Sequence, residues 1–137
     1  MIRGSATLGL AVALVIGACS PRPVQSISIG GAPWTVYRGD ADGMRGLPGF
    51  GDVDGMLFDM GREVDPAGAA FVMDGVDYPI DIAWFDGDGA FVSLGAMLPC
   101  DTVPCYLYRA DGPYRWAVEA PVGAFANLEP TDRLVVD

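Results

Sequence analysis

Residues 79–98 of the chain read PIDIAWFDGDGAFVSLGAML. Two apolar runs of the kind that favours extended strands, 79–85 and 90–98, flank the segment Asp86–Gly89, in which aspartate alternates with glycine. Aspartate and glycine both tolerate the left-handed backbone that a tight turn requires. The stretch therefore predicts a β-hairpin, with one strand on each side of the turn.

The same spacing of short apolar runs and turn residues continues along the chain, which has 19 glycines and 11 prolines. At 137 residues, 51% of them hydrophobic, the chain fits one domain with a real core. We expect an all-β barrel or sandwich with one or two short helical turns, one capped by Asp40 and one within 121–128. Further turns are expected at Gly30-Gly31 and Asp111–Pro113. The runs expected to form strands are 24–29, 34–37, 55–60, 69–73, 79–85, 90–98, 105–110, 114–120 and 132–136.

The charged residues exclude several classes of function. The net charge is −10, and the basic residues are all arginine, so the chain has neither lysine nor histidine. Ser-His and Cys-His catalysis, imidazole metal ligands, Schiff-base chemistry and a Walker-type phosphate loop each need one of those residues. An acidic chain also repels nucleic acid. We therefore expect no cofactor and no nucleic-acid partner.

Residues 1–20, MIRGSATLGLAVALVIGACS, have the composition of an export signal. Arg3 precedes an apolar run, 6–17, that is shorter than the roughly 20 residues a permanent membrane span needs. Residues 16–19, Ile-Gly-Ala-Cys, resemble a bacterial lipobox, in which the cysteine is lipidated and becomes the new N-terminus. The alternative is ordinary secretion, with Ala18 as the last residue of the signal.

These features give the expected organisation: a lipoprotein-type signal peptide at 1–18, a lipidated Cys19 with a tether at 19–26, and a single β-rich domain at 27–137. Prolines keep the tether extended. Ser20 is similar to the residue found after the cysteine in outer-membrane lipoproteins of two-membrane bacteria, where Asp favours inner-membrane retention. We expect the chain in the bacterial cell envelope, lipid-anchored on the periplasmic face of the outer membrane, with the membrane as a partner through Cys19.

Cys100 and Cys105 are separated by four residues in the stretch PCDTVPC. Export places them in an oxidising compartment, where cysteines form disulfides. A redox pair normally has two intervening residues and sits at a helix N-terminus, and no helix is expected here. Two cysteines without histidine make a poor zinc site. We expect a structural disulfide that adds about 2 kcal/mol at most, because the closed loop is short.

Several short motifs follow one another in the chain between Met44 and Val136. They are Arg45-Gly46-Leu47, Gly55–Phe58, Met73, Pro79 with Asp81-Ile82, Glu119, and Asp132-Arg133. This order resembles the bacterial and archaeal family catalogued as domain of unknown function 192 (DUF192). In that family Lys and Asn usually follow the Met, whereas Asp74 and Gly75 stand here, and Thr131 replaces a usual Gly. The resemblance implies a compact β-rich domain, often exported, with no established activity.

Three turns, at 40–43, 52–55 and 86–89, share the pattern Asp-x-Asp-Gly, which also opens a calcium-binding loop. A calcium loop needs a third oxygen ligand two residues further on, and methionine or alanine holds those positions here. Turn chemistry alone explains the pattern, because both residue types suit tight turns. We therefore expect no metal site.

Asp81 is the unusual residue of the opening stretch. Side chains of residues 80–85 alternate between two faces, and both faces are apolar apart from Asp81. A buried carboxylate must be ion-paired, hydrogen-bonded or protonated. Arg45 and Arg133 are candidate ion-pair partners, and Arg115 is a weaker one. The alternative is a carboxylate that accepts backbone N–H groups.

The functional interpretation places Asp81 at the floor of a cleft, with Glu119 as a second carboxylate. These two are the candidate catalytic residues, and Arg45, Asp81, Glu119 and Met73 are the candidate binding residues. We expect a cell-envelope lipoprotein domain that binds a small molecule, a glycan or an envelope protein without catalysis. The alternative is a carboxylate-dependent hydrolase acting on an envelope glycan. A purely structural accessory role is the third possibility.

Overall fold

The computed structural model describes residues 22–137. The expected signal peptide and the expected lipidation at Cys19 lie outside these residues. The described part is built from strands and contains no α-helix, and none of it forms a helix long and apolar enough to cross a membrane. The all-β prediction is confirmed. The strands are β1 (Val24–Ile29), β2 (Ala32–Arg38), β3 (Gly55–Val64), β4 (Ile80–Phe85), β5 (Phe91–Met97), β6 (Tyr114–Ala120) and β7 (Leu134–Val136).

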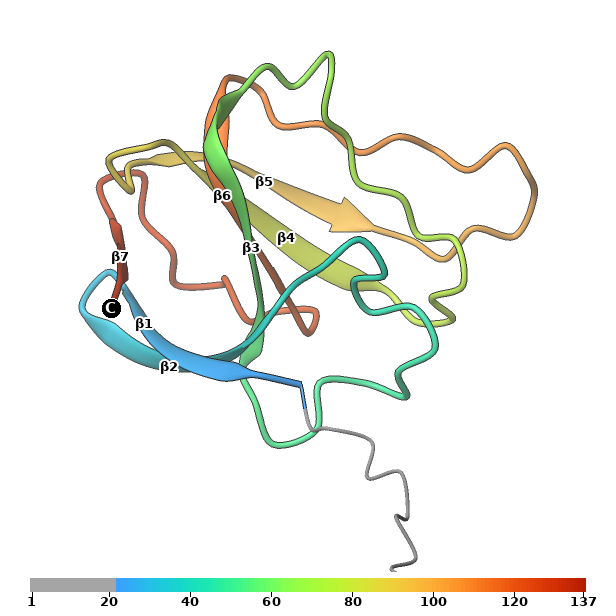
Figure 1. Ribbon diagram of the computed structural model, residues 1–137, viewed down its shortest axis with the longest axis horizontal. Coiled ribbons are helices and arrows are strands. Elements are labelled where there is room, and N and C mark those ends of the chain that lie inside the picture. Colours follow the sequence, from blue (N-terminus) through green and yellow to red (C-terminus); the bar gives the residue numbers. More distant parts are fainter. Residues whose placement is uncertain (1–21) are drawn as a thin grey trace, which may run out of the picture.

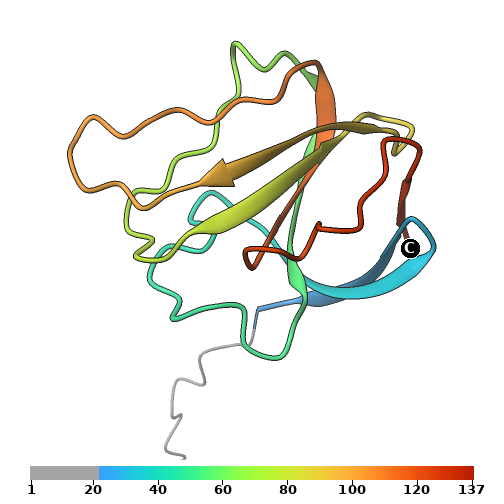
Figure 2. The same ribbon diagram turned by 180° about the vertical axis from the view of Figure 1, so that it is seen from behind.

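All seven strands form one sheet, in the order β5-β4-β6-β3-β2-β1-β7. Neighbouring strands are antiparallel, except that β2 and β3 are parallel. The sheet is strongly curled, so that β7 comes round to the turn between β4 and β5 (Figures 1 and 2). There Ala90 and Arg133 form a bridge, and the Leu134 N–H donates to the Gly89 carbonyl at 2.8 Å. The curled sheet is therefore nearly closed and barrel-like.

Two tight turns, one between β4 and β5 and one between β1 and β2, lie where the sheet closes. The hairpin predicted from residues 79–98 is present as β4 and β5, and the Asp86 carboxylate accepts the N–H groups of Asp88 and Ala90, each at 2.9 Å. Gly30 and Gly31, with φ of 58° and 79°, form the predicted turn between β1 and β2. Positive φ at both central residues is what a two-residue hairpin turn of type I′ requires.

The sheet carries a buried core on each face. The inner core is enclosed by the curled sheet, and its buried residues include Ile29, Val36, Leu57, Phe85, Val118 and Leu134. The outer core lies on the opposite face of β3, β4 and β6. The segments 39–54, 65–79 and 98–113 cover it and lie on one side of the sheet (Figures 1 and 2). Its buried residues include Phe58, Met73, Ile82, Trp84, Tyr114 and Ala117.

Two expected strands are wrong. Residues 69–73 and 105–110 meet only at an isolated bridge, in which Phe71 and Tyr108 exchange two backbone hydrogen bonds of 2.8 Å. Several of their apolar side chains, among them Phe71, Met73 and Tyr108, pack on the outer core, so the apolar runs reflect a covering loop rather than a sheet strand. The chain bends at Asp111 and Gly112, where a turn was expected, but the turn does not join two paired strands, because β6 pairs with β3 and β4 and not with 105–110.

The expected helical turns are present only as single hydrogen-bonded turns. In the first, the Asp40 carboxylate accepts the N–H groups of Asp42 and Gly43, so Asp40 caps the turn as predicted. In the second, bonds from residue i+3 to residue i recur between Pro121 and Leu128. The folded domain also begins earlier than the expected boundary at residue 27, because β1 starts at Val24.

The predicted disulfide between Cys100 and Cys105 is confirmed, with the Cα atoms 5.4 Å apart. It closes the outermost loop of segment 98–113, where most side chains are exposed. The disulfide therefore holds a loop over the edge of the outer core and does not join sheet elements.

The closure of the sheet gives a test that uses two glycines. Gly89 has a φ of 82°, and a methyl group at this position would overlap the carbonyl of Leu134. Gly31 has a similar φ of 79°, but a methyl group there would meet open space. We expect Gly31→Ala to lower the unfolding free energy by about 1 kcal/mol, the cost of left-handed backbone, and Gly89→Ala to lower it by roughly 2–5 kcal/mol. Urea unfolding measures both, and equal losses would contradict the closed arrangement.

Candidate functional site

Strand β6 lies in the middle of the sheet and fixes where Glu119 points. It is paired on one side with β3 and on the other with β4, and Glu119 stands opposite Met56 and Ile82. Directly opposed residues share a face of the sheet. Met56 and Ile82 belong to the outer core, so the Glu119 side chain enters the outer core as well.

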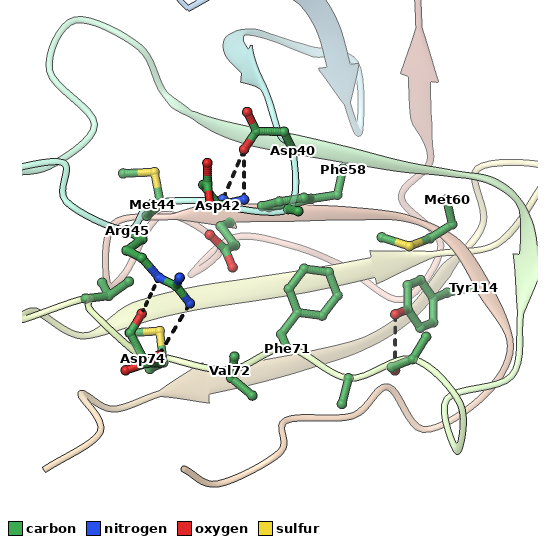
Figure 3. A pocket seen from close by; sticks show the side chains of 17 residues that line it. Asp40, Asp42, Met44, Arg45, Phe58, Met60, Phe71, Val72, Asp74 and Tyr114 are labelled. Carbon is green, nitrogen blue, oxygen red and sulfur yellow. Dashed lines mark hydrogen bonds and ion pairs between the residues drawn. The ribbon is translucent and has the colours of Figure 1, made fainter. Parts of the chain in front are cut away.

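Glu119 lines a cavity of about 230 Å³. The cavity lies between the outer face of the sheet and two covering segments, 40–45 and 69–76 (Figure 3). Most of the wall is apolar or aromatic, and the polar groups lie on the covering segments apart from Glu119 and Tyr114. The lining side chains include Met44, Phe58, Met60, Phe71, Met73, Val76 and Tyr114, with Asp40, Asp42, Arg45 and Asp74.

Glu119 is a buried residue whose carboxyl faces the cavity and has no protein partner among residues 22–137; within that range the one polar side-chain atom that is fully sealed and without a partner is Trp84 Nε1, so the carboxyl oxygens keep contact with the cavity space. The residue is 5% exposed, and no hydrogen bond or ion pair reaches its side chain from any residue in 22–137. Burial raises the pKa of this carboxyl from its ordinary value of 4.5 to about 7, because the charged form loses its hydration. The group is therefore poised to change its charge near neutral pH.

Tyr78 stands close to Glu119 on the side of the covering segments. Burial raises the pKa of the Tyr78 phenol, and the negative charges of Glu119 and Asp77 raise it further. The phenol donates a hydrogen bond of 3.0 Å to the carbonyl of Leu47, so it is already committed. Tyr78 therefore stays neutral, and its hydroxyl donates to Leu47 rather than to Glu119.

The only arginine on the cavity wall is paired with an aspartate. Arg45 donates from Nε to the Asp74 carbonyl at 3.3 Å and from a terminal nitrogen to the Asp74 carboxylate at 3.4 Å (Figure 3). Their side chains are 51% and 62% exposed, so this pair adds little to stability. Asp74 is one of the residues that depart from the DUF192 pattern, and its pairing with Arg45 balances the positive charge of that arginine.

Three aromatic rings form the deeper wall of the cavity. The Phe58 and Phe71 rings meet edge to face at 5.2 Å, and the Phe71 and Tyr114 rings lie 6.4 Å apart. The Tyr114 hydroxyl donates to the Ala69 carbonyl at 3.3 Å, which ties β6 to the covering segment (Figure 3). Burial raises the pKa of Tyr114, so this phenol also stays neutral. The sequence did not single out these rings, because an aromatic in a strand is more often plain core.

Asp81 lies on the other face of the sheet. It stands opposite Ala120, which belongs to the inner core, and its carboxylate accepts the Gly123 N–H at 2.8 Å. The sequence left two kinds of partner open for Asp81, an arginine or a backbone N–H group, and the structure shows the backbone N–H group. The arginines that were expected to pair with it have other partners: Arg115 binds Asp59 at 3.0 Å, and Arg133 donates to the Asp88 carbonyl at 3.2 Å.

The structure therefore separates the predicted site residues into two groups. Arg45, Met73 and Glu119, three of the four candidate binding residues, line the same cavity. Asp81 lines a shallow hollow with Gly95 and Phe125 and takes no part in that cavity. The expected catalytic pair of Asp81 and Glu119 is contradicted, because the sheet lies between the two carboxylates.

An aspartate of each Asp-x-Asp-Gly turn accepts a backbone N–H group, within the turn itself in two cases and from strand β2 in the third. Asp40 and Asp86 accept N–H groups of their own turns, and the Asp54 carboxylate accepts the Thr35 N–H at 2.8 Å. Across residues 22–137 there is no group of three or more acidic or cysteine side chains that could hold a metal ion. Each turn is explained by hydrogen bonding to N–H groups.

The raised pKa of Glu119 gives a stability test. Between pH 4.5 and 7 the folded chain keeps a proton on Glu119 that the unfolded chain has released, so stability falls as pH rises through this range. The difference in unfolding free energy between Glu119→Gln and wild type should therefore depend on pH. We expect it to shift in favour of Glu119→Gln by about 2–3 kcal/mol from pH 5 to pH 8. The same substitution at the exposed Glu129 is the control, and urea unfolding at both pH values measures it. A relative stability that does not change with pH would show that the carboxyl is not desolvated.

Comparisons with known proteins agree with this architecture. A protein from Sinorhizobium meliloti 1021, described as a candidate transcription regulator, has a solved structure that is 19% identical, with a TM-score of 0.69 over 84% of this chain and 95% of that one. A protein of unknown function from Novosphingobium aromaticivorans DSM 12444 is 21% identical, with a TM-score of 0.66 over 96% of this chain and 99% of that one. At these identities the likeness bears on the fold alone.

No curated protein matches the chain. The sequence profile of the DUF192 family, described as "Uncharacterized ACR", matches residues 37–136. That range contains the cavity, both of its covering segments and strands β3 to β7 in full. The chain therefore belongs to the DUF192 family.

Proposed function

We propose that the chain is a non-catalytic binding module that takes a small ligand in the cavity around Glu119. The observation that carries the proposal is the buried carboxyl, which faces the cavity with no partner among the described residues. A buried polar group without a partner costs free energy, and native proteins satisfy nearly all such groups. A ligand that bonds to Glu119 would remove this cost on binding.

The size and lining of the cavity support a small ligand. Its volume of about 230 Å³ lies below the roughly 300–1,000 Å³ of sites for drug-sized molecules. Apolar walls with a few polar groups are typical of small-molecule sites, and this cavity has aromatic and methionine side chains around one carboxyl. A polymer chain such as a glycan would need a longer groove than these residues provide.

The geometry favours binding over hydrolysis. A carboxyl whose pKa lies near 7 suits general acid–base catalysis. Glycoside hydrolysis also needs a second carboxylate about 5–10 Å away across the scissile bond. Asp81 lies on the opposite face of the sheet, and Asp74 is occupied by Arg45. The carboxylate-dependent hydrolase remains the alternative, and turnover of a bound compound would support it.

We further propose that the module works in the bacterial cell envelope, tethered by a lipid on Cys19. The support is the sequence alone: an apolar run over residues 6–17 followed by Ile-Gly-Ala-Cys at 16–19, with a disulfide further along the chain. Disulfides of this structural kind persist in exported proteins. A tether would place the cavity on the periplasmic side of the outer membrane.

A fragment screen tests the binding proposal. Leucine in place of Ala70, which lines the cavity, should fill it, while leucine in place of the exposed Ala67 on the same segment should leave it open. The purified full-length chain, in a non-ionic detergent, is screened by thermal shift against small neutral, cationic and anionic compounds. We expect some compounds to stabilise wild type and Ala67→Leu but not Ala70→Leu. At a free concentration of ten times Kd, the stabilisation should be about 1.4 kcal/mol. If no compound distinguishes the two variants, the cavity is not a binding site.

Localisation is tested by two variants in a two-membrane bacterium. We expect the wild-type chain to fractionate with the outer membrane and its mature N-terminus to carry lipid by mass spectrometry. Cys19→Ser should be released into the soluble periplasm, because the anchor is lost. Ser20→Asp should move the lipidated chain to the inner membrane. A wild-type mature chain that begins at residue 19 without lipid would overturn the lipid anchor and leave ordinary secretion.

A further inference from the structure

We propose that the ligand of this cavity is a small organic cation, an ammonium group on an apolar body, with the ammonium against the Glu119 carboxylate. The inference rests on the proposed binding function and names the chemical class of its ligand. Two independent observations lead to it: the partnerless buried carboxyl and the charge of the cavity wall.

The charges on the cavity wall are predominantly negative. Its acidic side chains are Asp40, Asp42, Asp74 and Glu119, and its single basic side chain is Arg45. Arg45 is bound twice by Asp74, so it does not present a free positive charge. Arg22, from outside the wall, reaches only Asp40, at 3.7 Å. An anionic ligand would therefore meet unbalanced negative charge, and a cationic ligand would relieve it.

The charge of the whole chain also favours a cationic ligand. The net charge is −10, and an acidic protein attracts cations to its surface and raises their rate of encounter. At the bottom of the cavity, an ammonium group bonded to an ionised carboxylate forms a charge-assisted hydrogen bond, which is roughly twice as strong as a neutral one. A neutral hydroxyl would also donate a charge-assisted hydrogen bond to the carboxylate, but it would lack the Coulomb attraction that the positive charge of the ammonium group adds.

The deeper wall suits the apolar body of such a ligand. The rings of Phe58, Phe71 and Tyr114 lie against one another and line the cavity together. Aromatic faces attract cations when water is excluded, and methionine side chains adapt to irregular apolar shapes. Met60 and Met73 complete this wall. An amine with a short aliphatic or aromatic group matches both the rings and the carboxylate.

Binding of a cation should depend on pH through Glu119. The charged and titratable groups that face it are Asp40, Asp42 and Arg45 on one covering segment, Asp74 and Tyr78 on the other, and Tyr114 on its own strand. Burial raises the pKa of both tyrosines, so neither takes a charge below neutral pH. With the pKa of Glu119 at about 7, the carboxyl becomes protonated as pH falls below 7, and it then loses its attraction for an ammonium group.

A matched set of three compounds tests the inference on the full-length chain. Benzylamine, benzyl alcohol and benzoate share one apolar body and differ in charge. Dissociation constants are measured by ligand-observed NMR at pH 8 and pH 5.5. We expect benzylamine to bind at least about tenfold more tightly than benzyl alcohol at pH 8, and benzoate to bind weakest. We expect the benzylamine affinity to fall about tenfold or more at pH 5.5, because few Glu119 carboxyls remain ionised.

Two glutamate variants separate the local carboxylate from the overall charge. Glu119→Gln should weaken benzylamine at pH 8 by about tenfold or more and remove its pH dependence, but weaken benzyl alcohol less. Glu129→Gln removes the same charge from an exposed position and should leave all three compounds unchanged. Benzylamine that binds no better than benzyl alcohol, or that binds Glu119→Gln as tightly as wild type, would overturn the cation inference.

The filled-cavity variant keeps the two proposals apart. If none of the three compounds binds wild type more tightly than Ala70→Leu, the binding function itself fails. If benzyl alcohol or benzoate binds in an Ala70-dependent way and benzylamine does not, the cavity is a binding site and only the ligand class is wrong.

Discussion

The double pairing of β6 with β3 and β4 is the constraint on which the rest of the structure depends. The pairing of a central strand fixes the directions of its side chains, because alternate residues point to opposite faces of the sheet. Val118 and Ala120 take the inner core, so Glu119 between them has only the outer core to enter. A slip of one residue would place the carboxyl inside the barrel and the small apolar residues outside it. The burial of Glu119 is thus imposed by the strand that holds the sheet together.

A buried carboxyl of this kind has to be supported by its surroundings. The covering segments 40–45 and 69–76 lie over it without filling the space, and they bring aspartates and the Arg45–Asp74 pair to the wall. The hydroxyl of Tyr114 donates to the covering segment, and that of Tyr78 donates to the Leu47 carbonyl, so neither donates a hydrogen bond to Glu119. No hydrogen bond or ion pair within residues 22–137 therefore offsets the free-energy cost of burying this charge. An offset by a bound cation would explain why the fold tolerates the residue.

The sequence predicted the fold well and the site in part. The alternation of residues 80–85 placed Ile82 and Asp81 on opposite faces, and the structure agrees. Alternation within one strand does not tell which face of the sheet a residue of another strand occupies. It could therefore not show that Asp81 and Glu119 lie on different faces. The partner of a carboxylate depends on contacts between distant segments, which is why the sequence could not decide between an arginine and a backbone N–H group for Asp81. The runs 69–73 and 105–110 looked like strands because a loop packed on a core is as apolar as a strand.

The central claim is that Glu119 is buried in its cavity without a counter-charge. The most direct measurement is a pH titration of glutamate side-chain carboxyl carbons by ¹³C NMR, because the chain has only Glu63, Glu119 and Glu129 to assign. Glu119→Gln identifies the resonance by its loss. The account predicts that the Glu119 signal titrates with a pKa of about 7. A Glu119 signal that titrates near the ordinary 4.5 would show a hydrated or partnered carboxyl and would contradict the account.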